Sequence, residues 1–249
     1  TEGKHDSSEE KLYSKYCEYL GFLFFKVLEF KAEIIDTRSE EADVLAEKEG
    51  QNGYKIVIDT KAARLSRTAL NVKDYKVDSL GSTWRTKRGA NYSALFNPIG
   101  FFLKSSSQLY EKAIDHNVTM ISYTHLIFLL SIPDIEKKDL RPLWEIGKSL
   151  QRLSPKDRKS ADTYWKTIDS AILSFGLNVQ DWKDCKKNAS KQLRMIVGEE
   201  ISNIETLEKD IMQMDTEVLR AQLIKSRKHD KIKESIKDKL EIAKWLDSN

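Results

Sequence analysis

The sequence predicts an α/β protein: a mixed central sheet whose elements follow the order αβββαβ, continued by a helical C-terminal extension. Three observations lead to this prediction. Apolar runs with helix-like and strand-like spacing alternate over the first half of the chain, an Asn-Gly pair separates two of the strand-like runs, and strand-like runs stop at about residue 134. We therefore expect a core domain over residues 1–133 and a helical extension over residues 134–249 that packs on the core.

The first predicted element is a helix over roughly residues 8–28, behind an acidic start. Its apolar side chains recur at the spacing of an amphipathic helix. They are Leu12, Tyr16, Leu20, Leu23 and Val27. We interpret the tyrosines of this helix as core and boundary residues rather than as a base-stacking platform. These are Tyr13, Tyr16 and Tyr19.

The strands are predicted from four short runs. The runs EADVLAEKEG and YKIVIDTKA flank Gln51-Asn52-Gly53 and should form an antiparallel hairpin. NYSALFN, which ends before Pro98, is the third strand, and VTMISY is the fourth. A helix is expected between them in SSQLYEKAIDHN, and a short apolar helix in THLIFLLSI, which Pro133 stops.

The predicted extension contains two apolar stripes at helical spacing. One consists of Ile201, Ile204, Leu207 and Ile211, and the other of Ile232, Ile236, Leu240 and Ala243. Stripes of this kind pack in a core or against a second copy of the chain. We therefore expect the extension to take part in dimerisation, while its basic run KSRKHDKIKESIKDK could also contact phosphates.

Composition restricts the classes of function. The net charge of +3 over 249 residues does not by itself indicate a polyanion partner, but the segment from Lys55 to Arg88 has nine basic and three acidic residues, a local charge of +6. Two cysteines are too few for a disulfide framework or a zinc site and indicate a reducing compartment. The longest apolar stretches are too short to span a bilayer and no secretory signal opens the sequence, so we expect a cytoplasmic protein without a membrane partner.

The end of the second hairpin strand carries two charges on one face. Because side chains alternate along a strand, Val57, Asp59 and Lys61 point the same way. Asp43 lies 16 residues before Asp59, on the partner strand, and the hairpin can bring the two carboxylates together. Adjacent carboxylates repel unless a cation lies between them, and oxygen ligands favour Mg²⁺. The lysine could hold the attacking water and stabilise charge on a phosphate.

This arrangement, an acid, a second acid and a lysine two residues later, is the signature written PD-(D/E)xK. A structural salt bridge at a sheet edge would explain the Asp-x-Lys triplet equally well. The offset of Asp43, the apolar strand before Asp59 and the αβββαβ order favour the nuclease interpretation, which implies a core like that of restriction endonucleases.

The basic segment after Lys61 mixes residues that bind phosphates with residues that can contact base edges. The alternative is a solvated basic loop, but beside a candidate nuclease centre we expect DNA contact. The candidates are Arg64, Ser66, Arg67, Thr68, Asn71, Lys73, Lys76, Arg85, Lys87 and Arg88.

These residues also carry a family resemblance. EADVLAEKEG, YKIVIDTKAARLSRTALNVKDYKV and SQLYEKAIDHNVTMISYTHLIFLL resemble HindIII-type type II restriction endonucleases, and WKDCKKNASKQL extends the resemblance more weakly into the C-terminal helices. The resemblance implies that Asp59 and Lys61 are the catalytic pair, with Asp43 on the adjoining strand. It also implies that Asp74 is a further catalytic and metal-binding acid, and that Asp36, which stands where the family has a glutamate, is another candidate for both roles.

We therefore expect a Mg²⁺-dependent, sequence-specific endonuclease that cuts double-stranded DNA at a short palindrome and leaves 5′-phosphate ends. Mn²⁺ should substitute for Mg²⁺, and Ca²⁺ should support binding without turnover. Cutting both strands of a palindrome predicts a homodimer. The alternatives are a structure-specific repair or recombination nuclease and a DNA-binding module whose acids are structural.

Overall fold

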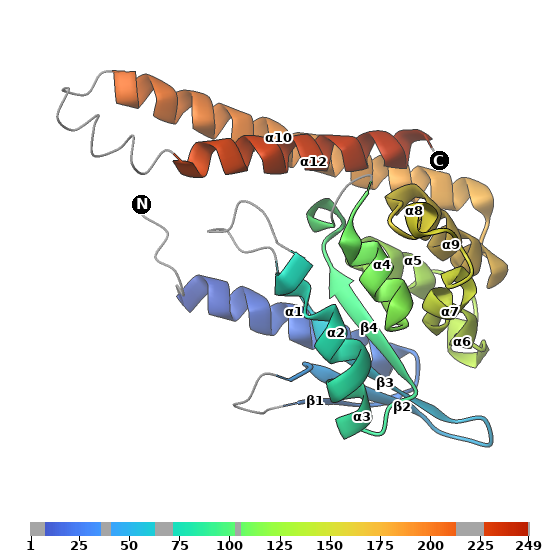
Figure 1. The fold of residues 1–249 in the computed structure, drawn as a ribbon. Helices are drawn as coiled ribbons and strands as arrows, with labels where there is room; N and C mark the ends of the chain where they lie inside the picture. Colours follow the sequence, from blue (N-terminus) through green and yellow to red (C-terminus); the bar gives the residue numbers. More distant parts are fainter. Residues whose placement is uncertain (1–7, 36–40, 63–71, 103–105, 213–226, 249) are drawn as a thin grey trace.

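The computed structural model describes residues 8–35, 41–62, 72–102, 106–212 and 227–248 (Figure 1). A five-stranded mixed sheet in the order β1-β2-β3-β4-β5 forms its centre. The strands are β1 Lys31–Ile34, β2 Val44–Lys48, β3 Tyr54–Thr60, β4 Tyr92–Asn97 and β5 Val118–Ser122. β1, β2 and β3 pair antiparallel, while β3, β4 and β5 are parallel. The α/β class with a mixed sheet is confirmed.

The predicted hairpin is present as β2 and β3. Val44 lies across from Ile58, and the turn closes where Gly53 N donates to Gly50 O. Gly50 has a φ of 116°, a conformation that glycine adopts without strain. The pairing brings the start of β2 to the end of β3, so the two predicted acidic positions lie at the same end of the sheet.

Helices cover both faces of the sheet. The predicted helices are present as α1 Ser8–Val27, α4 Gln108–Asp115 and α5 Tyr123–Leu130. α1 packs on one face, where Gly21 lets it approach so closely that a Cβ there would lie 3.0 Å from the Thr60 methyl group. On the other face a Cβ on Gly81 would lie 2.6 Å from His116 Cβ, so only glycine allows this approach.

The αβββαβ order is present. It is formed by α1, β1, β2, β3, the helical connection after β3, and β4, whereas β2, β3, β4, α4 and β5 were expected to follow α1. β1 was not predicted, because its four residues are mostly exposed and therefore lack a hydrophobic pattern. The helical connection between β3 and β4, which lies in front of the strands in Figure 1, was not predicted either. This connection consists of η1 Val72–Tyr75, α2 Val77–Ser79, the π-helical η2 Leu80–Trp84 and α3 Arg85–Lys87. Its pieces are too short for a clear helical period.

The face of α1 that packs against the core is not the one predicted from the apolar spacing. Leu12, Tyr16, Leu23 and Val27 are exposed, and the helix instead buries Cys17, Phe24 and Phe25, followed by the buried Leu28 just after its end. Both sides of α1 are apolar, so periodicity alone could not identify the buried one. Tyr13 and Tyr19 are exposed as well.

The C-terminal half is helical, as predicted. Its elements after α5 are η4 Ile135–Lys137, α6 Arg141–Trp144, α7 Ile146–Leu150, α8 Pro155–Arg158, α9 Ala161–Ser174, α10 Val179–Met212 and α12 Arg227–Ser248. One hydrophobic core joins α6, α7 and α9 to the sheet, so this part packs on the core. The division at residue 134 stays a prediction. None of the helices in the described ranges is long and apolar enough to cross a membrane.

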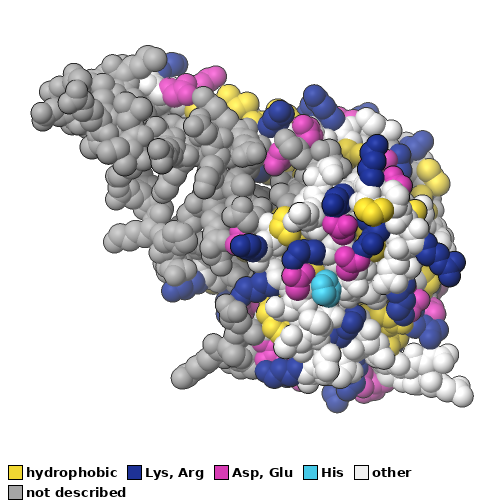
Figure 2. All heavy atoms as spheres, in the orientation of Figure 1, with side chains coloured by type: hydrophobic (Ala, Val, Ile, Leu, Met, Phe, Trp, Pro, Cys, Tyr) yellow, Lys and Arg dark blue, Asp and Glu magenta, His cyan; other side chains and the backbone are white. Residues whose placement is uncertain are grey.

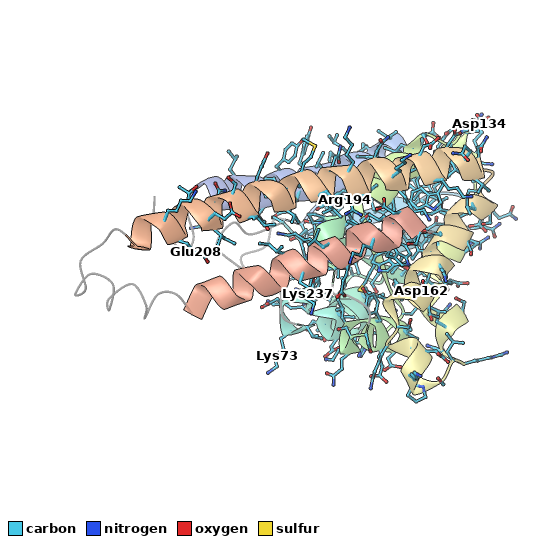
Figure 3. All side chains as sticks on the ribbon, turned by 90° about the horizontal axis from the view of Figure 1, so that it is seen from above. Lys73, Asp134, Asp162, Arg194, Glu208 and Lys237 are labelled. Atoms are coloured by element: carbon cyan, nitrogen blue, oxygen red, sulfur yellow. The ribbon has the colours of Figure 1, made fainter. Side chains whose placement is uncertain are left out.

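α10 and α12 run side by side and antiparallel (Figure 3). They pack through Ala189, Leu193, Ala243 and Leu246, next to the 3-10 helix η3 Ile99–Phe101. Ile236 and Ala243 of the α12 stripe are buried, so this stripe packs within the chain. On α10, Ile201 is exposed, while the side chains of Leu207, Ile211 and Ile232 lie outside the described residues.

Candidate active site

The end of β3 holds the closest charge pair of the predicted centre. Asp59 is buried, with 3% of its surface exposed, and Lys61 follows just after the strand. The Lys61 ammonium lies 2.6 Å from Asp59 Oδ2, so the two side chains form a close ion pair. Burial raises the pKa of the Asp59 carboxyl to about 7; the Lys61 charge opposes this shift and the Asp43 charge adds to it.

Asp43 is fixed beside this pair by the residue between its two members. Asp43 Oδ2 accepts hydrogen bonds from Thr60 N at 2.6 Å and from Thr60 Oγ1 at 2.9 Å. Its own backbone N–H donates to Ile58 O at 2.9 Å. The structure thus brings Asp43 close enough to Asp59 for its charge to act on the Asp59 pKa. The proximity expected from the hairpin is present, although the contact runs through Thr60.

Lys76, in the connection after β3, lies close enough to this centre for its charge to act on Asp59. Its positive charge lowers the pKa of Asp59, against the effect of burial. Lys76 adopts a left-handed backbone conformation with φ of 46°, which is uncommon for a residue with a side chain and turns the chain from η1 into α2. Asp74 lies in η1, two residues earlier, and is partly exposed.

Two polar residues near this centre were not predicted. Tyr123 Oη donates to the Lys61 carbonyl at 3.4 Å, and Lys61 N donates to Phe96 O at 2.7 Å, so both sides of the Lys61 backbone are held. Asn97 ends β4 and is fully buried, against Tyr75. Both Tyr123 and Asn97 are polar residues at the end of an apolar strand run, which is the signal that could have identified them.

Arg85, Lys87 and Arg88 have partners within the protein. The buried Glu41 carboxylate binds Arg88 Nε at 2.6 Å and Lys87 Nζ at 3.0 Å, and these contacts lower the pKa of Glu41 to about 2, Arg88 contributing most. Arg85 donates to His116 O at 3.2 Å. This clamp ties α3 to the segment just before Asp43. DNA contact by these three residues stays a prediction.

The other predicted DNA-binding residues divide between exposed and undescribed positions. Lys73 is exposed and projects from the protein body (Figure 3). Asp36, Arg64, Ser66, Arg67, Thr68 and Asn71 lie outside the described residues. On the face drawn in Figure 2, basic and acidic side chains alternate over the surface.

The residues of this centre fit a hard divalent cation. Mg²⁺ is commonly bound through one or two carboxylates, with waters and substrate phosphates completing its shell. Asp59 and Asp43 supply two such carboxylates, and the raised pKa of the buried Asp59 is what a nearby cation would reverse. Within the described ranges, no three His, Cys, Asp or Glu side chains gather into a closed metal site. The arrangement therefore suits an open site that needs further ligands.

The chain is similar in sequence to a family of restriction endonucleases. A family model described as HindIII restriction endonuclease matches residues 2–239. The Type II restriction enzyme HindIII of Haemophilus influenzae is 34% identical over 148 residues, which are 58% of this chain and 48% of that enzyme. The match thus spans about half the length of that relative. A structure of restriction endonuclease FokI matches 53% of this chain and 26% of that chain, with 14% identity and a TM-score of 0.33.

The raised pKa of Asp59 predicts a pH-dependent stability in the absence of metal. The folded state favours the protonated carboxyl, whose ordinary pKa is 3.8, so this contribution is complete below about pH 4 and is lost as the pH rises through about 7. We expect the free energy of unfolding of the wild type to fall between pH 5 and 8 in EDTA. Asp59→Asn should show a smaller fall and, at pH 8, a melting temperature several degrees higher, at roughly 2–4 °C per kcal/mol.

Thermal unfolding at a series of pH values measures this difference. Asp184→Asn is the matched control, because the Asp184 side chain is exposed on α10, where it accepts a hydrogen bond from the neutral Gln180 amide, and its removal should leave the pH profile unchanged. Identical pH profiles for the wild type and Asp59→Asn would show that the Asp59 carboxyl titrates normally.

Proposed function

Because the chain belongs to the HindIII restriction endonuclease family, we propose that it is a Mg²⁺-dependent type II restriction endonuclease that cuts double-stranded DNA at a short palindrome and leaves 5′-phosphate ends. The observation that carries the proposal is the buried Asp59 carboxylate, paired with Lys61 at 2.6 Å and next to Asp43. A structural salt bridge alone does not require a second carboxylate fixed beside the first. The family and the site therefore support the same chemistry.

Each side chain of the centre has a role in this proposal. Asp59 and Asp43 would hold the cation, with Asp74 and Asp36 as further candidate ligands. Mg²⁺ would supply charge stabilisation at the phosphate and lower the pKa of a bound water. The Lys61 ammonium would orient the attacking water and stabilise the negative charge that develops on the phosphate. Thr60 and Tyr123 position Asp43 and the Lys61 backbone through their hydrogen bonds.

DNA would bind over the end of β3. Lys76 and Lys73 lie in the connection that follows this strand, and the candidates between Arg64 and Asn71 precede them in sequence. These cations would bind phosphates, while arginine and asparagine side chains can contact guanine and adenine. We propose a homodimer, because two active sites related by a two-fold axis match the symmetry of a palindrome.

The first test of this function is cleavage of a supercoiled plasmid. Asp59→Asn and Asp43→Asn remove charge that the cation needs while nearly preserving side-chain shape, so cutting in Mg²⁺ should fall at least 100-fold. Lys61→Ala should lose turnover to a similar degree through the water and the phosphate charge. Mn²⁺ should support cutting, and Ca²⁺ should support binding alone.

Binding in Ca²⁺ and thermal unfolding serve as controls for these variants. Folded variants that bind DNA but do not cut it would support the proposal. If Asp59→Asn and Lys61→Ala both cut at near wild-type rates, the nuclease centre lies elsewhere. Discrete plasmid fragments indicate a restriction enzyme, preferential cutting of branched DNA indicates a repair nuclease, and binding without cutting indicates a DNA-binding module.

The second test measures the salt dependence of DNA binding. Each neutralised phosphate contributes roughly 0.9 to the slope of log affinity against log salt. Lys76→Ala should flatten this slope by about one phosphate contact. Arg88→Ala should mainly lower thermal stability, because it leaves the buried Glu41 with one cation. An unchanged slope for Lys76→Ala would show that Lys76 does not contact DNA.

A third test concerns Asp74. Asp74→Asn should reduce cleavage severely and leave the melting temperature nearly unchanged, because Asp74 is partly exposed in η1. Normal turnover by the folded variant would assign Asp74 a structural role.

A further inference from the structure

α1 presents an uncovered apolar stripe to the surface. Leu12, Tyr16, Tyr19 and Leu23 are 73%, 55%, 48% and 36% exposed, respectively. At 100° per residue these four side chains fall within an arc of about 60° on the helix. Their spacing of four, three and four residues is that of a coiled-coil seam. No element in the described parts of the chain buries this stripe.

The order of residues in the stripe is the same in both chain directions. Read from either end, it is Leu, Tyr, Tyr, Leu with intervals of four, three and four. If two copies of α1 pack antiparallel about a two-fold axis between residues 17 and 18, Leu12 meets Leu23 of the other copy and Tyr16 meets Tyr19. Such self-complementarity is what an isologous interface requires. A different partner would not impose this symmetry.

The stripe continues into a groove on the same helix. A pocket of about 300 Å³ lies between α1, the end of β4, the start of α5 and the α10–α12 pair, with Tyr13, Tyr16 and Leu20 on its α1 side. On the opposite side Ile196 of α10 lines the pocket and is 47% exposed. The apolar surface therefore extends from the α1 seam to α10.

We propose that α1 is the dimer interface: α1 of a second copy packs antiparallel on Leu12, Tyr16, Tyr19 and Leu23, and its flank extends over the groove toward α10. The need for a two-fold axis rests on the proposed function, whereas the choice of surface rests on the stripe. A half-exposed aromatic side chain offers on the order of 100 Å². The stripe therefore supplies roughly half of the ~800 Å² per partner of a standard interface, and contacts over the groove and its rim would supply the rest.

The lysine-rich edge of the stripe marks one boundary of the proposed interface. Lys11, Lys15 and Lys26 are exposed along one side of the four apolar residues. Lysines solvate the rim of an interface and are depleted from its centre. The groove side has tyrosine and leucine instead, so the second copy must extend in that direction. This arrangement also separates the α1 interface from the α12 stripe, which packs on α10 within the chain.

Disulfide cross-linking tests the antiparallel register directly. In a Cys185→Ser background, Leu12→Cys/Leu23→Cys should form a covalent dimer on oxidation, because position 12 meets position 23 of the other copy. Within one chain these positions are about 16 Å apart, too far for a disulfide. The native Cys17 is buried and should not react. Each single variant should remain uncross-linked, and Lys15→Cys/Leu23→Cys is the matched control on the lysine edge.

Charge substitution provides a second readout, by sedimentation equilibrium. Tyr16→Lys/Tyr19→Lys places like charges opposite each other across the two-fold axis and should raise the dimer dissociation constant at least tenfold. Tyr16→Lys/Tyr19→Glu places opposite charges there and should recover most of the affinity. Circular dichroism checks that both variants fold. Equal weakening by the two double variants would overturn the proposed pairing of 16 with 19.

The outcomes separate this interface from the nuclease assignment, because wild-type cleavage of plasmid DNA is measured independently. An active dimer without the 12–23 cross-link overturns the α1 interface and leaves the nuclease function standing. A cross-linked dimer without cleavage supports the interface and counts against the function. Cross-linking of the single variants would indicate a parallel pair, and a wild-type monomer would overturn both the interface and the homodimer.

Discussion

The candidate centre depends on the burial of one carboxylate, Asp59, at the end of β3. Burial in a protein interior disfavours the charged form, and the pKa of about 7 expresses that penalty. Two cations reduce it: the Lys61 ammonium at 2.6 Å and the nearby charge of Lys76. The site is thus held in a state that a divalent cation would stabilise further, because the cation favours the ionised carboxylate.

The sheet supports this carboxylate from three strands. β2 brings Asp43, which Thr60 fixes with two hydrogen bonds, and β4 accepts the Lys61 N–H through Phe96. The residue after β5, Tyr123, reaches the Lys61 carbonyl. Parallel strands end at one edge of a sheet, so β3, β4 and β5 deliver their last residues to the same place. Positions that are distant in sequence therefore hold Asp43 and the Lys61 backbone beside Asp59.

The connection between β3 and β4 separates the basic residues by role. Its first part carries Lys76 toward Asp59, whereas its last part places Lys87 and Arg88 on the buried Glu41. Glu41 lies two residues before Asp43, so this clamp also holds the segment that leads into the site. A local excess of positive charge thus serves the fold of the protein as well as any DNA.

The sequence alone determined the α/β class, the hairpin, the positions of β4 and β5, and the pairing of Asp59 with Lys61, because alternation along a strand and turn residues are local properties. It could not locate β1, the short helices of the connection, or the exposed face of α1, since these have weak or two-sided apolar patterns. The tertiary structure decided which basic residues approach Asp59 and added Tyr123 and Asn97, because such proximity depends on which strands end together. Long-range packing, and not local pattern, assembles the site.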